Sequence, residues 1–214
     1  MTRSHAWGTA RRGAVKARSR AADTARESIS HVTPHVPTLA PPRSKIVPTG
    51  VERPWSSDEI IVSKTDLAGR ITYANDVFLR VSQYTRAELL GAPHSIIRHP
   101  DMPRAVFALL WQGLEARREV FAYVKNLARS GDHYWVFAHV TPSLGRDGRP
   151  CGYHSNRRTV DRRALVAIEA LYARLLQAES GHALKRDAIA ASTALLDRLL
   201  ADQGLTYDEY VWRV

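Results

Sequence analysis

The spacing of apolar and polar residues becomes regular near residue 58 and changes its period several times after that. The stretch EIIVSKTDLAGRITYAN, residues 59–75, predicts two short strands joined by a turn at 66–69 that ends in glycine. Two short helical segments follow, NDVFLRVSQY and TRAELL. The second starts at Thr85 and has Glu88 three residues later, which is a capping-box pattern and predicts a helix start there.

A longer helix is predicted from Pro103 to Arg117, because its apolar residues recur at helical spacing on one face. Proline suits the first turn of a helix, where the N–H that it lacks has no partner in any case. The apolar residues on this face are Val106, Phe107, Leu110, Trp111 and Leu114.

Three strand-like runs come next: EVFAYVKNLAR, HYWVFAHVTPSLG and CGYHSNRRTV. Turn sequences at 130–132 and 146–148 separate them, so they predict consecutive antiparallel strands. Strands and helices kept in separate groups are typical of the α+β class and not of repeated βαβ units. We therefore predict an α+β fold with a five-stranded antiparallel sheet, short helices and one longer helix.

The chain after Thr159 has a purely helical pattern. Two amphipathic runs, RRALVAIEALYARLLQAES and KRDAIAASTALLDRLLADQG, are separated by a Ser-Gly turn at 180–181. They predict an antiparallel helical hairpin, followed by a tail with the sequence TYDEYVW. The predicted domain boundaries are therefore 53–160 for the sheet domain and 161–214 for the hairpin and tail.

The first quarter of the chain lacks the residues for a core, since no aromatic residue lies between Trp7 and Trp55. Residues 1–54 contain ten basic and three acidic residues, which accounts for +7 of the net charge of +10. We predict that residues 1–52 form a disordered basic arm. A solvated tail and weak contact with acidic lipid or nucleic acid are both compatible with this charge.

Composition excludes several classes of protein. There is no apolar run of about 18 residues that would predict a transmembrane helix, and residues 1–20 lack the apolar core of a secretory signal. The single cysteine, Cys151, excludes an internal disulfide framework and a cysteine-rich zinc site. A cytoplasmic location is the expectation, and the scattered histidines show no metal-binding spacing.

The most unusual stretch is IIRHPDMPRAVFALLWQGL, which places Arg98, His99 and Asp101 between two prolines at the start of the longer helix. A cation and an imidazole in this position would suit a ligand that carries or gains negative charge. Asp101 could orient either of them through a charge-assisted hydrogen bond. A capped turn with an internal ion pair is the alternative interpretation.

These motifs resemble the flavin-binding PAS domain of aerotaxis receptors. The resemblance covers about 100 residues and rests on TDLAGRITYANDVFLRVSQYTRAELLGAPHSIIRHPDMP, then LWQGL, VKN, SGDHYWV and VTP. It implies a PAS fold with a noncovalently held FAD, whose redox state is transmitted as a signal. Aerotaxis receptors continue into a membrane anchor and a long coiled coil, and this sequence has no such segments after its two C-terminal helices.

The resemblance implies that Arg98, His99 and Asp101 line the flavin site. It also suggests that Trp111 stacks on the flavin or gates its access, although core packing is an equal alternative. Asn126 is the best candidate for a switch, because a buried amide both donates and accepts hydrogen bonds and can turn over. Asn75 could contact the ligand, but a helix cap is the simpler role for it.

Neighbouring residues on a strand point to opposite faces, so only one of Tyr134 and Trp135 can face a cavity. We predict that Trp135 faces inward with Phe137 and that the Tyr134 face packs against helices.

Two related chemistries are weaker candidates. Light-oxygen-voltage photochemistry needs a cysteine beside the flavin, and residues 94–101 contain none. Haem would need an axial histidine, for which His94 or His99 could serve.

The overall prediction is a non-enzymatic redox sensor that holds FAD and signals to a protein partner or within a homodimer. A cofactor-free PAS interaction module is the first alternative. A nucleic-acid-associated regulator that uses the basic arm is the second.

Overall fold

The computed structural model of the protein describes residues 46–214. Most of the predicted basic arm, residues 1–45, lies outside the described residues. Within 46–214, no helix is both long enough and apolar enough to cross a membrane.

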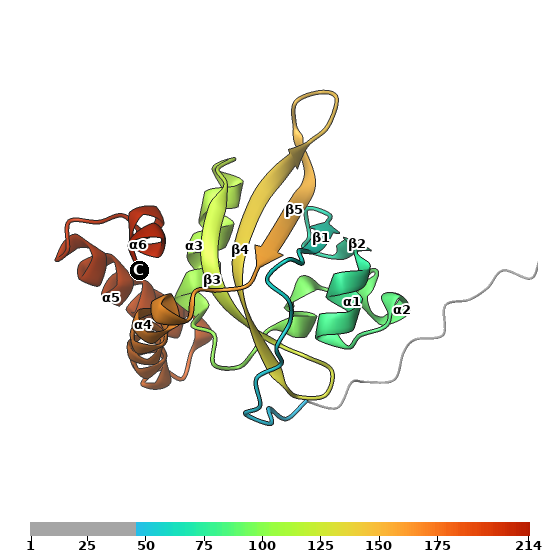
Figure 1. The fold of residues 1–214 in the computed structure, drawn as a ribbon. Coiled ribbons are helices and arrows are strands. Elements are labelled where there is room, and N and C mark those ends of the chain that lie inside the picture. Colours follow the sequence, from blue (N-terminus) through green and yellow to red (C-terminus); the bar gives the residue numbers. More distant parts are fainter. Residues whose placement is uncertain (1–45) are drawn as a thin grey trace, which may run out of the picture. The chain divides into compact units, whose positions relative to one another are not determined.

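Five antiparallel strands form one sheet (Figure 1). They are β1 (Ile61–Thr65), β2 (Ile71–Ala74), β3 (Val120–Leu127), β4 (His133–Leu144) and β5 (Pro150–Arg158). Their spatial order is β2-β1-β5-β4-β3, so the last strand in sequence lies at the centre beside the first. The predicted α+β class and the five-stranded antiparallel sheet are confirmed.

Four helices connect the two halves of the sheet: α1 (Asp76–Ser82), α2 (Arg86–Leu89), the 3₁₀ helix η1 (His94–Ile97) and α3 (Arg104–Glu115). The predicted capping box is present, since Thr85 and Glu88 exchange hydrogen bonds at the start of α2. The longer predicted helix is α3, which begins one residue after Pro103.

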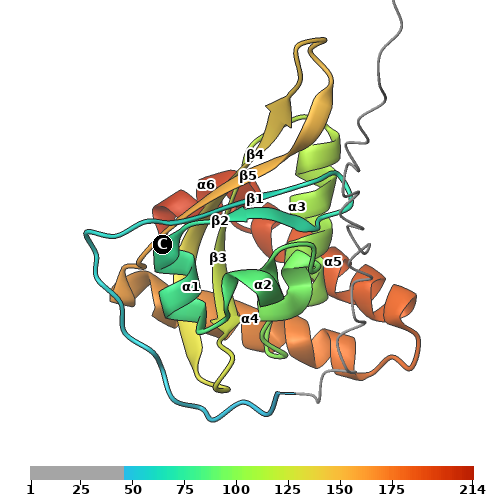
Figure 2. The same ribbon diagram turned by 90° about the vertical axis from the view of Figure 1, so that its right-hand side faces the viewer.

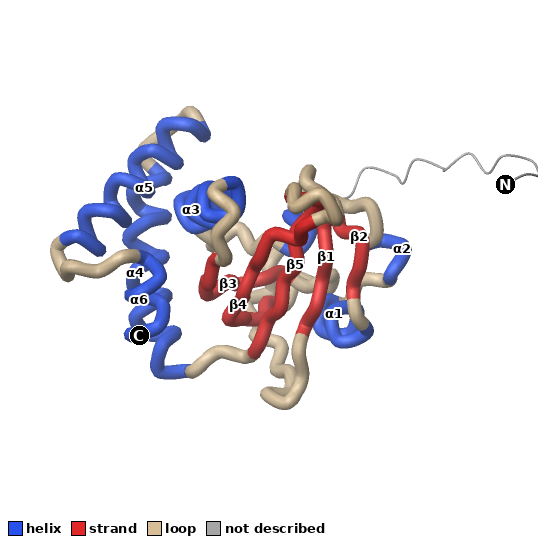
Figure 3. Tube along the Cα trace, turned by 90° about the horizontal axis from the view of Figure 1, so that it is seen from above, coloured by secondary structure: helices blue, strands red, loops and turns tan. Residues whose placement is uncertain are grey.

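The C-terminal part contains α4 (Arg162–Ser180), α5 (Lys185–Ala201) and α6 (Tyr207–Arg213). Helices α4 and α5 are the predicted hairpin, and both lie beside the β3 edge of the sheet, away from α1 and α2 (Figures 1 and 3). In the view of Figure 2 these helices pass behind and beside α3. Helix α5 packs on α3, and Tyr172 of α4 donates to the Tyr123 carbonyl of the edge strand β3 at 2.6 Å.

Helix α6 falls on the segment that was predicted to be a tail. Thr206 accepts a hydrogen bond from the backbone N–H of Glu209, whose side chain accepts from the Thr206 N–H in return. The pattern Thr-x-x-Glu was readable in the sequence as a capping box. Trp212 on this helix packs against Phe121 and Phe137, with ring centroids 4.9 and 5.1 Å apart.

The end of the predicted arm is held against the sheet domain. Thr49 donates its backbone N–H to Gly131 at 2.9 Å and its hydroxyl to Asp132 at 2.7 Å. Arg53 and Val51 exchange backbone hydrogen bonds with His133. Residues 49–53 therefore pair with the start of β4, four residues N-terminal to the predicted boundary at 53.

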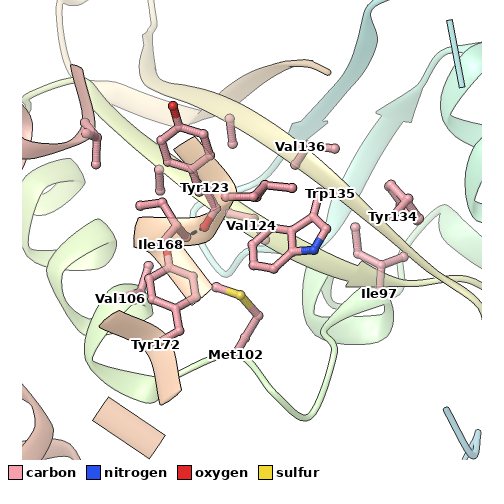
Figure 4. Packing of buried hydrophobic residues seen from close by; sticks show 14 of the residues in the cluster. Ile97, Met102, Val106, Tyr123, Val124, Tyr134, Trp135, Val136, Ile168 and Tyr172 are labelled. Carbon is pink, nitrogen blue, oxygen red and sulfur yellow. Dashed lines mark hydrogen bonds between the residues drawn. The ribbon is translucent and has the colours of Figure 1, made fainter. Parts of the chain in front are cut away.

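The two faces of β4 are the reverse of the prediction. Trp135 is buried against Tyr172 of α4, with ring centroids 6.2 Å apart (Figure 4). Phe137 packs against Trp212 of α6. Tyr134, Val136 and Ala138 occupy the opposite face, which looks toward the connecting helices. The reason is that α4 and α6 need an aromatic surface to bury their own apolar sides, and the Trp135 face supplies it.

Candidate functional site: a cavity between the sheet and α3

A cavity of about 290 Å³ lies between the inner face of the sheet, η1 and α3. This face combines alternate residues of β3, β4, β5 and β1, because side chains two apart on a strand share a side. Its walls are largely apolar, and the apolar residues include Phe107, Leu110, Leu114, Val124, Ala138 and Val140. The polar side chains in the lining include Ser63, His94, Arg98, Asn126, Ser155 and Arg157.

Arg157 is the most unusual of these residues, because it is a charged residue that is only 4% exposed. Its Nη2 donates to the Ser63 hydroxyl at 2.7 Å and contacts the Nε2 of His94 at 2.6 Å. The guanidinium carbon lies 5.1 Å from the centre of the Phe78 ring. Burial lowers the pKa of Arg157 to about 10, which still leaves it charged at neutral pH.

His94 is a neutral acceptor in this arrangement. An arginine can only donate, so the Nε2 that faces Arg157 must be unprotonated and the ring proton must be on Nδ1. Ser63 can then donate to the same Nε2, which lies 3.1 Å from its hydroxyl. Burial, and then the positive charge of Arg157, lower the pKa of His94 to about 3.

Asn126 and Arg98 are brought together at the cavity by an isolated antiparallel bridge between their backbones. Asn126 is 3% exposed, and its Nδ2 has no hydrogen-bond partner within residues 46–214. Arg98 lies 4.0 Å over the Phe107 ring and donates to the Met102 carbonyl at 3.2 Å. Burial, and then Arg104, lower the pKa of Arg98 below its usual value.

Trp111 also lines the cavity and is 38% exposed. Its ring meets Tyr153 of β5 edge-on, with centroids 5.4 Å apart. Gly69, in the β1–β2 turn with a φ of +73°, comes so close that a Cβ there would lie 3.3 Å from the indole. The turn, Trp111 and Tyr153 therefore border one part of the cavity.

His99 and Asp101 are not among the cavity residues. His99 is 2% exposed, and its Nδ1 accepts the backbone N–H of Asp101 at 3.1 Å. Burial, and then Lys125, lower the pKa of His99 to about 4. The Asp101 carboxylate pairs with Lys125 at 3.1 Å on the surface. His99 and Asp101 thus form a capped turn, which was the alternative to a ligand site in the interpretation of the sequence.

Asn75 and Trp135 also lie outside the cavity lining. The Asn75 side chain accepts the backbone N–H groups of Phe78 and Val62, both at 3.0 Å, so it caps α1 and ties it to β1. Trp135 belongs to the face that packs on α4. Of the predicted site residues, the structure gathers Arg98, Trp111 and Asn126 at one cavity and places the other four elsewhere.

The sequence prediction did not include Arg157, Ser155 or Ser63 in the site. The signal that could have found them is the alternation on β5, where Tyr153, Ser155 and Arg157 share one face. Cys151 is exposed in the β4–β5 hairpin, and its Sγ lies 3.4 Å from the Ser143 carbonyl.

Helix α3 connects this cavity to the C-terminal helices. Its apolar face carries Phe107 and Trp111, and its first turn has no side-chain cap from Pro103. The buried carboxylate of Glu179 on α4 takes the place of that cap, since it accepts the backbone N–H groups of Arg104 and Ala105. Ser192 of α5 donates to the same carboxylate at 3.0 Å.

Comparison with known proteins assigns the fold to a family. Residues 71–157 match a family model described as PAS fold, and the chain therefore carries a domain of the PAS family. The aerotaxis receptor of Escherichia coli strain K12 is 44% identical over 119 residues. The alignment covers 56% of this chain and 23% of the receptor.

Two other relatives are named for a regulatory role and for biofilm dispersion. A nitrogen fixation regulatory protein of Klebsiella pneumoniae is 32% identical over 101 residues, which cover 47% of this chain and 20% of that protein. A biofilm dispersion protein of Pseudomonas aeruginosa is 34% identical over 87 residues, or 39% of this chain and 20% of that protein. The matched region spans about a fifth of the length of these relatives.

Proposed function

We propose that this protein is a redox-responsive signalling sensor whose PAS domain binds FAD in the cavity between the sheet and α3. The observation that carries the proposal is buried Asn126, which lines a cavity with apolar walls and whose Nδ2 has no hydrogen-bond partner among residues 46–214. A buried polar group without a partner is costly, so its presence at a cavity supports a ligand that would satisfy it.

The cavity also has the size and character of a site for the ring of a flavin. Small-molecule sites typically have about 300–1,000 Å³, apolar walls and a few convergent polar groups. A volume of about 290 Å³ fits a planar ring system better than a whole dinucleotide. The rest of the FAD molecule would lie outside it.

Bound FAD would supply the ability to accept and return electrons reversibly. Asn126 would hold one edge of the ring and, by turning its amide, could donate or accept a hydrogen bond there. Arg98 keeps a positive charge near the ring, where its guanidinium is held against Phe107. Trp111 and Tyr153 would limit the access of water.

The signal would be transmitted from the cavity to the C-terminal helices through α3. This helix carries cavity residues on one face, and its N-terminus is held by Glu179 of α4 and, through that carboxylate, by Ser192 of α5. A shift of α3 in response to the occupant would therefore change the docking of both C-terminal helices. A ligand can bias such an equilibrium only by its differential affinity for the two arrangements.

The output would be read by a signalling protein or by a second copy of this chain, in the cytoplasm. Val166 of α4 and Leu184 before α5 are exposed apolar residues on the C-terminal helices, at 72% and 60%. These helices are therefore the surface on which we expect a partner to act.

The test is an absorption spectrum of the freshly purified full-length protein, before and after dithionite and after incubation with FAD. We expect a flavin spectrum that is bleached on reduction. The variant Asn126→Leu should lose it, whereas Asn156→Leu, on the opposite face of β5, should keep it. Wild-type protein that stays colourless after incubation with FAD would leave a cofactor-free interaction module as the function.

A further inference from the structure

Arg157 has no acidic partner among residues 46–214. Its Nη2 is satisfied by two neutral groups, Ser63 and His94, and its Nη1 has no hydrogen-bond partner among the described residues. Charged groups are almost never buried without a pairing group, because the loss of hydration far exceeds what neutral contacts return. A fully buried cation of this kind at a cavity therefore calls for an explanation outside the protein's own contacts.

The unsatisfied atoms of the cavity share one chemical character. Three buried polar atoms of residues that line the cavity have no hydrogen-bond partner in the described part of the chain: Asn126 Nδ2, Arg157 Nη1 and Ser155 Oγ. The first two can only donate hydrogen bonds, and the serine hydroxyl can donate as well. The cavity thus offers donors at several points, and a complementary ligand must supply acceptors.

The contacts around Arg157 indicate which nitrogen of its guanidinium is left to bind a ligand. Ser63 and His94 occupy Nη2, and the Phe78 ring covers the guanidinium on one side. His94 cannot relieve the charge, because it is held neutral as an acceptor. The free Nη1 is therefore the position at which a ligand atom with high electron density would bind.

We propose that Arg157 is the charged anchor of the cavity and selects a planar heteroaromatic ligand by an edge that carries carbonyl oxygens. This inference rests on the proposed function, and for FAD the edge is the dione side of the ring and not the diphosphate. The Arg98 guanidinium donates a hydrogen bond to the Met102 carbonyl, so Arg98 and Arg157 have different roles at the cavity.

This assignment predicts that substitution of Arg157 has opposite effects on stability and on binding. Replacing an unpaired buried cation with an apolar side chain of similar length removes an uncompensated charge, so the ligand-free protein becomes more stable. The same change removes the anchor, so the ligand binds more weakly. A purely structural arginine would lose stability and leave the affinity unchanged.

The experiment compares full-length wild type, Arg157→Met, Arg157→Lys and Arg158→Met, each stripped of ligand. Arg158 is the next residue on β5 and is exposed on the other face, so it is a matched control. Thermal unfolding is measured without ligand, and affinity is measured by quenching of the fluorescence of FAD and of riboflavin, which lacks phosphate.

We expect a higher unfolding midpoint for ligand-free Arg157→Met than for wild type. Its affinity for both flavins should fall by at least about tenfold, as for loss of one hydrogen-bonded buried charge. Arg157→Lys should lose less affinity, because it keeps the positive charge but lacks the planar guanidinium with its paired N–H donors. Arg158→Met should match wild type in both measurements.

Wild-type protein that binds neither flavin would overturn the proposed function together with this inference. Wild-type binding with unchanged affinity in Arg157→Met, or in Arg157→Lys if the methionine variant does not fold, would overturn this inference alone. An affinity loss for FAD without one for riboflavin would also overturn it, since Arg157 would then bind the diphosphate.

Discussion

The Glu179 carboxylate on α4 accepts a hydrogen bond of 2.5 Å from the backbone N–H of Arg104, the first residue of α3. The two residues are 75 positions apart in the sequence. A negative charge at a helix N-terminus is favourable, because the first N–H groups have no partner within the helix and the helix dipole is positive there. The C-terminal hairpin thus completes a helix of the PAS domain.

The first prediction concerns this cap. Glu179→Ala should lower the free energy of unfolding by about 1–3 kcal/mol, because it leaves buried N–H groups of α3 without an acceptor. Urea unfolding followed by circular dichroism measures the change. Glu169→Ala, an exposed site on the same helix, is the control and should differ little from wild type. Equal losses in both variants would contradict the capping role.

The second prediction concerns the docking of α6. Trp212→Ala should lower the free energy of unfolding by about 1–2 kcal/mol, since the ring packs edge-on against Phe121 and Phe137 but is 63% exposed. Hydrogen exchange should show loss of protection confined to 207–213. Val166→Ala, at a side chain that is 72% exposed, should leave both measurements unchanged. Full protection of α6 in Trp212→Ala would show that other contacts hold the helix.

The third prediction is a dependence of stability on pH. His94 has a pKa of about 3 in the folded protein, lowered by burial and then by Arg157, against 6.5 for the free side chain. The unfolded chain therefore binds a proton below pH 6.5 that the folded protein does not bind. Stability is lost as the pH falls from 6.5 toward 3, by up to about 1.4 kcal/mol per pH unit.

His99, with a pKa lowered to about 4 by burial first, acts in the same direction. In His94→Gln, the loss of unfolding free energy between pH 7 and pH 5 should be about 2 kcal/mol smaller than in wild type. Urea unfolding at the two pH values provides the comparison, with His182→Gln at an exposed site as control. The same pH dependence in all three proteins would rule out a neutral buried His94.

The fourth prediction separates backbone strain from contact with Trp111. Gly69 and Gly148 have φ angles of +73° and +72°, but a Cβ at Gly148 would meet open space. Alanine at either site should cost about 1–2 kcal/mol for the left-handed backbone. Gly69→Ala should also displace the Trp111 indole and weaken FAD binding, measured by fluorescence quenching. Equal affinities in the two variants would show that the Gly69–Trp111 contact does not shape the cavity.

Local patterns in the sequence were sufficient to predict most elements of the fold. The capping box of Thr85 and Glu88, the position of Pro103 and the turn sequences all act over a few residues, so they need no knowledge of the tertiary structure. Helix α6 carries the same kind of signal in Thr206 and Glu209, although it was predicted as a tail.

The cavity could be predicted only in part. Arg98, Trp111 and Asn126 lie in motifs that resemble a known family, and the structure brings these three together. His99 and Asp101 lie in the same motif but point elsewhere, because a turn of three residues cannot direct every side chain to one side. Sequence proximity alone does not define a site.

The sequence by itself determined which residues share a face of each strand, since alternation is a property of the extended backbone. It did not determine which face is buried against which neighbour. The packing of α4 on Trp135 and of α6 on Phe137 decides this, and the Tyr134 face therefore lies on the inner side of the sheet. Only the tertiary structure placed Arg157 beside His94 and Glu179 at the start of α3, because these contacts join segments at least 60 residues apart.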